Sequence, residues 1–146
     1  MQAIQASFSH SFLCAGIYDE RIAITAPHVS GPGGTGSWRF FDPNQRPYGL
    51  EAVKERHPYF WTPRLFSFVG HEDRLPFDGH SAKALIAPRV LLNTHTRKDY
   101  ETNPYGTYLT HLAAQRVFDL LEAPDNCLIH WRDGRRWDMM GSPEAQ

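Results

Sequence analysis

Cysteine is scarce in this sequence, and neither sign of charge is in large excess. The chain has 146 residues and two cysteines, Cys14 and Cys127, which are too few for a disulfide framework. One bridge or two buried thiols are both open, and buried thiols are the commoner case. The 15 Lys and Arg against 16 Asp and Glu leave a formal charge of −1. Such a balance provides no field to hold a polyanion, so we expect no nucleic-acid partner.

Long apolar runs, basic leader segments and internal repeats are also missing. No run of 18 apolar residues occurs, so the sequence predicts no membrane span. The first residues show no signal-peptide pattern, which leaves the compartment unknown. A composition of 41% hydrophobic and 21% charged residues excludes a disordered chain or a coiled coil. We therefore expect a single folded domain, which at this length buries roughly two-thirds of the surface of its unfolded chain.

Hydrophobic spacing predicts an α/β chain. The expected order is a helix at 7–16, a strand at 21–26, a long irregular insertion to about 78, a short helix at 81–86, a strand at 89–95, a helix at 107–123 and a strand at 127–131. Strands joined through helices are normally parallel, which gives about three parallel strands with flanking helices. The insertion is rich in aromatic residues and broken by prolines, so its rings are expected to form a lid or cleft wall rather than a core.

The helix at 107–123 carries the clearest pattern. Its apolar residues recur at steps of three and four, which predicts the face that packs on the sheet: Leu109, Leu112, Ala113, Val117, Leu120 and Leu121. His111 is expected at the surface or half-buried.

Three segments should meet where the parallel strands end. They are the glycine-rich loop at 30–37, Asp99 after the second strand, and residues 132–137 after the third. The glycine-rich loop lacks the Gly-Lys-Ser/Thr ending of a phosphate loop, so it is interpreted as a turn of special backbone geometry.

Metal and nucleophile motifs are absent as well. The polar stretch from His71 to His80 has no metal-ligand spacing, and it is interpreted as a loop in which Asp78 caps the next helix. We expect no metal and no cofactor. No Gly-x-Ser-x-Gly elbow is present, although Ser7, Ser9 and Ser11 offer hydroxyl groups near the first helix.

Several segments in order resemble a known family. They are Asp-Glu-Arg-Ile-Ala at 19–23, Ser-Gly-Pro-Gly-Gly at 30–34, Ser-Trp-Arg at 37–39, Leu-Pro-Phe-Asp-Gly-His at 75–80, Ala-Leu-Ile-Ala-Pro-Arg at 84–89 and Thr-Asn-Pro-Tyr-Gly-Thr-Tyr at 102–108. Together they resemble the C-terminal part of glucuronoyl esterases, carbohydrate esterases of the α/β-hydrolase fold. The resemblance implies an incomplete α/β-hydrolase over 1–137, followed by a polar tail at 138–146.

The resemblance implies a serine esterase that needs no metal. Such enzymes cleave esters between 4-O-methyl-glucuronic acid on xylan and lignin alcohols through a serine, a histidine and an acid. In this chain the serine position falls at Ala6, the usual acid at Val29 and the histidine at Arg136. A one-residue gap would bring Ser7 to the serine position instead. His130 lies inside the last strand, and arginine cannot act as a general base.

Other implied positions concern the substrate. A sugar-contacting lysine falls at His10 and a sugar-stacking tryptophan at Glu101, while Trp38 is a predicted substrate-binding residue. Some members take their acid from the loop after the second strand, where Asp99 survives as the one candidate catalytic residue. A glucuronate-bearing carbohydrate ester is the implied ligand, and relatives are typically secreted.

Three hypotheses follow. The chain is a truncated and catalytically degenerate member of the esterase group, or a non-catalytic carbohydrate-binding module with aromatic faces at Trp38, Tyr59, Phe60 and Trp61. In the third, it is a fragment that needs a separate N-terminal half. Because the earlier strands have no counterpart, the strand at 22–26 is expected to be an unpaired edge open to self-association.

Overall fold

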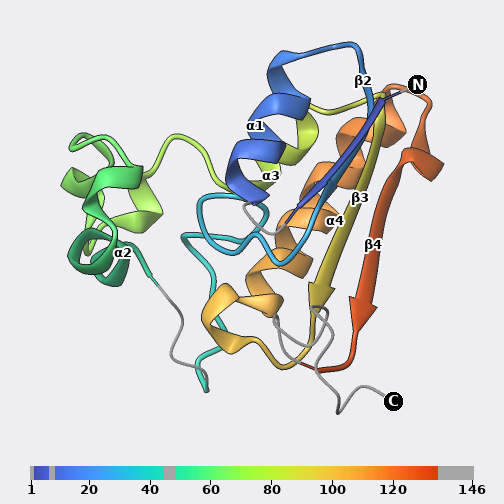
Figure 1. Cartoon of the computed structure of the whole chain (residues 1–146). Helices are drawn as coiled ribbons and strands as arrows, with labels where there is room; N and C mark the ends of the chain where they lie inside the picture. Colours follow the sequence, from blue (N-terminus) through green and yellow to red (C-terminus); the bar gives the residue numbers. More distant parts are fainter. Residues whose placement is uncertain (1, 7–8, 45–48, 135–146) are drawn as a thin grey trace.

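A parallel four-stranded sheet forms the centre of the protein. The computed structural model describes residues 2–6, 9–44 and 49–134. The strands lie in the order β1-β2-β3-β4 (Figure 1) and are Gln2–Ala6, Ile22–Pro27, Val90–Thr96 and Cys127–Arg132. The predicted α/β class is confirmed, with strand bounds within one residue of the expected ones.

Strand β1 was not expected from the sequence. It pairs in parallel with β2, from Gln2 beside Ile22 to Ala6 beside Pro27. The prediction that the 22–26 segment is an edge is therefore wrong, because β2 lies between β1 and β3. The five residues Gln-Ala-Ile-Gln-Ala have weak strand propensity, and it is the neighbouring strand that makes them extended.

Three helices pack against one face of this sheet. They are α1 (Ser9–Tyr18), α3 (Gly79–Ala84) and α4 (Pro104–Leu120). A strand order that follows the sequence places right-handed crossover helices on the same side. Their shared core cluster consists of Leu13, Ile86, Leu91, Phe118 and Cys127. Among the described residues, no helix covers the opposite face, where Leu128 is 45% exposed.

Helix α1 runs two residues past Gly16, which was expected to end it. The α-carbon of Gly16 lies against the side chain of Thr25 on β2, and an added β-carbon would collide with the Thr25 hydroxyl. The glycine therefore lets α1 approach the sheet closely and does not terminate the helix.

Helix α4 turns a different face inward from the predicted one. Leu112, Leu120 and Leu121 are 47%, 79% and 47% exposed. The buried face carries Pro104, Gly106, Thr107, Thr110, His111, Ala114 and Phe118. The apolar-stripe prediction is wrong, as is the expectation for His111, because hydrogen bonds described below hold the threonine-rich face against α3.

The insertion forms a lobe beside the sheet (Figure 1). It contains α2 (Leu50–Arg56) and the short 3-10 turns Pro58–Phe60, Leu65–Phe68 and Glu72–Arg74. Contrary to expectation, the lobe has its own core cluster of Trp38, Leu50, Val53, Leu65 and Leu75.

None of the described helices is long and apolar enough to cross a membrane. Cys14 and Cys127 are free thiols, exposed and buried respectively, so the bridge is not formed.

Candidate active site

The predicted loops meet at the carboxyl edge of the sheet. The backbone N–H of Arg97, after β3, donates to the carbonyl oxygen of Arg132 at the end of β4, at 3.1 Å. Gly31 in the glycine-rich loop packs against Thr102, whose α-carbon would lie 3.5 Å from an added β-carbon. Segments that follow three different strands are thus adjacent, as ligand sites in such sheets require.

Ala6 ends β1, and α1 begins three residues later at Ser9. A strand followed within a few residues by a helix is the local order in which α/β-hydrolases carry their nucleophile. An alanine methyl group cannot attack an ester carbonyl. Ser7, the alternative nucleophile, lies outside the described residues.

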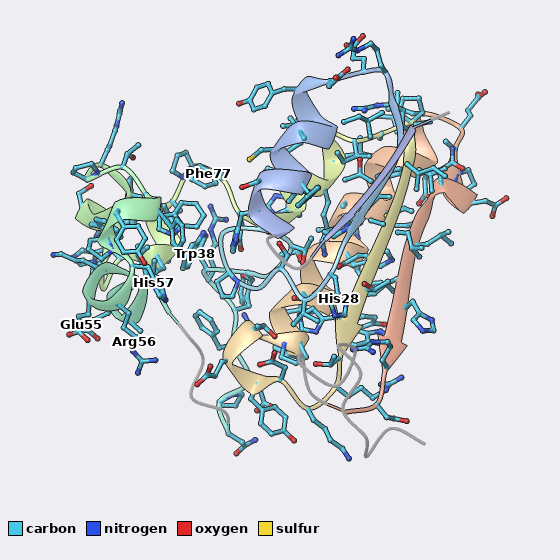
Figure 2. The ribbon with its side chains drawn as sticks, in the orientation of Figure 1. His28, Trp38, Glu55, Arg56, His57 and Phe77 are labelled. Carbon is cyan, nitrogen blue, oxygen red and sulfur yellow. The ribbon has the colours of Figure 1, made fainter. Side chains whose placement is uncertain are left out.

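Val29 occupies the position implied for the acid and has an unusual backbone. Its φ is 45°, in the left-handed region that β-branched residues rarely adopt, and its side chain is fully buried. Its N–H donates to the carbonyl oxygen of Thr94 at 2.9 Å. Beside it, His28 Nδ1 lies 2.8 Å from the Thr94 hydroxyl at the carboxyl end of the sheet (Figure 2). The chain turns sharply here, but the valine has no titratable group.

Asp99 and Glu101 follow β3. Asp99 is half-buried, and its carbonyl oxygen accepts hydrogen bonds from the N–H and the hydroxyl of Thr102, at 3.2 and 2.8 Å. Glu101 is exposed in the 3-10 turn Tyr100–Thr102. Asp99 as the acid and Glu101 as a substrate contact stay predictions. Arg136, the implied histidine position, lies outside the described residues.

Trp38 and His10 both pack against the ring of Trp61. The Trp38 ring is 1% exposed and packs edge-on against Trp61 at a centroid distance of 5.8 Å, where the sheet body meets the α2 lobe (Figure 2). The His10 ring packs edge-on against Trp61 at a centroid distance of 5.5 Å, and its Nε2 is 3.3 Å from the carbonyl oxygen of Pro32. In this conformation Trp38 offers no face to a sugar, and the substrate-binding roles stay predictions.

A buried carboxylate that sequence reasoning treated only as a helix cap fixes the loop beside the site. Asp78 accepts a hydrogen bond from Gly79 N–H at 2.9 Å, which confirms the cap of α3. It also accepts from the Ser37 hydroxyl at 2.5 Å and from Trp38 N–H at 2.7 Å. No local signal shows these partners, which lie some forty residues away in the chain.

Asn103 makes a second set of long-range contacts. Its φ is 56°, and its Oδ1 accepts from Gly106 N–H at 2.9 Å, which caps α4. Its Nδ2 donates to the carbonyl oxygens of Ser37 at 3.0 Å and Phe40 at 2.8 Å. The Asn-Pro pair signals a helix start in the sequence, but not this contact with the loop.

Lys83 joins α3, α4 and the glycine-rich loop. Its buried ammonium group donates to the carbonyl oxygen of Thr107 at 2.8 Å and to the Thr110 hydroxyl at 2.9 Å. That hydroxyl donates in turn to the carbonyl oxygen of Thr35 at 2.6 Å. Burial lowers the pKa of Lys83 to about 7. We call these three buried residues, Asp78, Asn103 and Lys83, the loop framework.

Metal ligation has no support in the part of the chain that the structure describes. There, no three His, Cys, Asp or Glu side chains are placed to hold a metal ion. Burial also lowers the pKa of His95, on β3, to about 4, so its imidazole is neutral at physiological pH.

The parallel sheet, its crossover helices and the loops that meet at its carboxyl edge are those of an α/β-hydrolase. The family model described as fungal glucuronyl esterase matches residues 7–122, more than half of the chain. A 4-O-methyl-glucuronoyl methylesterase from Phanerochaete carnosa is 33% identical over 118 residues, which are 78% of this chain and 29% of that protein. The chain belongs to the glucuronoyl esterase family.

Solved structures agree with this assignment. A carbohydrate esterase family 15 glucuronoyl esterase from Caldicellulosiruptor kristjansonii superposes with a TM-score of 0.85 at 25% identity, over 99% of this chain and 44% of that one. A glucuronoyl esterase variant from Sporotrichum thermophile gives a TM-score of 0.82 at 22% identity, over 90% and 37%. The chain therefore spans less than half the length of these relatives.

Proposed function

We propose that this chain recognises glucuronate esters of carbohydrates and hydrolyses them poorly. The observation that carries the proposal is Ala6 at the end of β1 and just before α1, where the family resemblance implies a serine. A Ser-His-acid mechanism needs a hydroxyl to attack the carbonyl and an imidazole to carry the proton. Ala6 and Val29 supply neither a nucleophile nor an acid.

In one relative, binding of an ester does not require the serine hydroxyl. The Sporotrichum thermophile relative is a serine-to-alanine variant in complex with methyl 4-O-methyl-β-D-glucopyranuronate. In that protein, loss of one serine hydroxyl is compatible with a bound ester. Because Ala6 likewise has a methyl group where serine has a hydroxymethyl group, the proposal separates recognition from turnover.

Two measurements on the full chain test the proposal. Methyl and benzyl glucuronate esters are titrated into the protein by calorimetry, and release of alcohol is followed against a heat-killed control. We expect saturable ester binding with turnover at or near the control rate. Efficient hydrolysis, or a folded chain that binds no ester, would contradict the proposal.

A second candidate function is completion of a larger sheet by another polypeptide. Parallel sheets in α/β proteins are normally covered on both faces. Here α1, α3 and α4 cover one face, and on the other Val90 and Leu92 are only half-buried. The occupant that fits is the amino-terminal part of a glucuronoyl esterase, since the chain spans 44% of a solved relative.

Co-expression tests this candidate. The first half of a relative's catalytic domain, supplied on a second plasmid with a different affinity tag, should co-purify with this chain in equal amounts. A monodisperse monomer that does not bind the second polypeptide would exclude this candidate function. A homodimer would show that a second copy of the chain covers the face instead.

A further inference from the structure

A pocket of about 310 Å³ opens where β3 and β4 end and α4 begins. It is lined by Arg97, Pro104, Tyr105, Tyr108 and Trp131. None of these is a position that the resemblance assigns to the nucleophile, the acid, the histidine or a sugar contact. Its volume is at the lower end of the range for small-ligand pockets, roughly 300–1,000 Å³, so it suits a ligand the size of one sugar residue.

The walls of the pocket are aromatic. Tyr105 and Tyr108 are three residues apart on α4, which places them on the same face of the helix, and they are 47% and 44% exposed. Trp131 is half-buried on β4, and its ring packs against the ring of His95 at a centroid distance of 5.5 Å. Flat rings with a phenolic hydroxyl at the edge suit a ligand that has both an apolar face and polar substituents.

Among the lining residues that the structure describes, Arg97 carries the charge. Its guanidinium carbon lies 5.5 Å from the centre of the Trp131 ring, a cation–π distance. Its backbone N–H is tied to the carbonyl oxygen of Arg132, which fixes the base of the side chain. Within the described residues no carboxylate pairs with this guanidinium. A planar guanidinium binds a carboxylate through two parallel hydrogen bonds.

The start of α4 adds to the positive potential. Pro104 and Tyr105 form its first turn, which contains no acidic residue. The N-terminus of a helix carries a partial positive charge, which favours an anion nearby. The His95 ring behind Trp131 is neutral at physiological pH, because burial lowers its pKa to about 4. In the described lining, the positive charge that a ligand meets is therefore that of Arg97, together with the partial charge of the helix terminus.

We propose that this pocket binds a uronic acid residue in its free, ionised form. The carboxylate would pair with Arg97, and the sugar ring would stack on Trp131 and Tyr108. That the ligand is a sugar rests on the proposed function, whereas the preference for an anion rests on Arg97 itself. An ester of the same sugar is neutral and loses the ion pair, so the pocket selects the acid and differs in this from an ester-cleaving position.

Ligand competition and matched variants test the pocket in the full chain. D-glucuronate, its methyl ester, D-glucose and benzoate are titrated by calorimetry, with tryptophan fluorescence as a second readout. We expect D-glucuronate to bind at least about tenfold more tightly than the ester or glucose. Arg97→Gln should remove that advantage, and Arg97→Lys should keep part of it. Arg64→Gln, which makes the same change in the second pocket beside Phe60 and Phe77, is the control and should leave it intact.

The outcomes separate this inference from the proposed function. Two results overturn the pocket assignment and leave the proposed function standing. One is ester binding without a preference for the acid. The other is a preference for the acid that persists in the Arg97→Gln variant when its melting curve is unchanged. Benzoate binding as tight as that of glucuronate overturns the sugar assignment. If neither acid nor ester binds to the folded chain, both proposals fail.

Discussion

The loop framework and the implied catalytic positions differ in the side chains that they carry. Asp78, Asn103 and Lys83 are buried, and each side chain bonds to backbone or hydroxyl groups of distant segments. Ala6 and Val29, at the positions implied for the nucleophile and the acid, bear side chains without polar atoms. The framework thus has its hydrogen bonds in place, whereas the two positions that the family resemblance implies for the nucleophile and the acid carry no reactive group.

Val29 links the two regions. Its positive φ is a conformation that costs on the order of 1–3 kcal/mol for a residue with a branched β-carbon. The backbone nevertheless adopts it, because the glycine-rich loop that follows is held by Asn103 and Thr110. The turn therefore follows from the framework and not from the side chain of Val29.

The largest expected effect is loss of the Asp78 carboxylate. Asp78→Ala leaves the Ser37 hydroxyl and the N–H groups of Trp38 and Gly79 without their acceptor inside the protein, so we expect a loss of about 4 kcal/mol in the free energy of unfolding. Urea denaturation measures it. Asp73→Ala, an exposed acid on the lobe, should change it by less than about 0.5 kcal/mol. Similar values for the two variants would remove Asp78 from the framework.

Part of this organisation could be predicted from the sequence. The strands from Ile22 onward and the cap at Asp78 follow from apolar runs and from an Asp before a short helix, both of which are local signals. The inward face of α4 could not be predicted, because Thr107 and Thr110 are held there by Lys83, whose position depends on the packing of α3. Strand β1 could not be predicted for a similar reason, since its pairing partner lies twenty residues further along the chain.

The candidate site was predicted less well than the fold. The family motifs locate the ends of the strands, and so Ala6 and Val29, through residue order alone. The pocket at Arg97 and Trp131 combines the loop after β3, the strand β4 and the start of α4, and no spacing in the sequence relates them. Burial of Trp38 is likewise a property of the α2 lobe, because Trp38 belongs to the core cluster that contains Leu50 and Val53.

Lys83 gives the next largest effect, which depends on pH. Its pKa is about 7 in the folded protein and 10.5 in an unfolded chain, so above pH 7 the unfolded state binds the extra proton and stability rises with pH. We expect a slope approaching about 1.4 kcal/mol per pH unit between roughly pH 7.5 and 9. Burial raises the pKa of Cys127 from 9.0 to about 11, and this opposes the trend only at higher pH.

Urea denaturation at several pH values measures this slope. Lys83→Met replaces the ammonium by an apolar group of similar length and should flatten the dependence in that window. Lys54→Met, an exposed change on α2, should preserve it. A wild-type curve that is already flat would show that Lys83 stays protonated in the folded protein, held by Thr107 and Thr110.

The smallest expected effect is that of restoring one catalytic group. Ala6→Ser returns a hydroxyl to the end of β1, but without a base its proton has no acceptor, and triad members act as a unit rather than additively. We expect hydrolysis of benzyl glucuronate to change by less than about tenfold, with the melting temperature unchanged. The triple variant Ala6→Ser, Val29→Glu, Arg136→His is the comparison. A gain of about a thousandfold from Ala6→Ser alone would mean that another residue already acts as the base, and the contrast between an intact framework and lost chemistry would then reduce to a single missing oxygen atom.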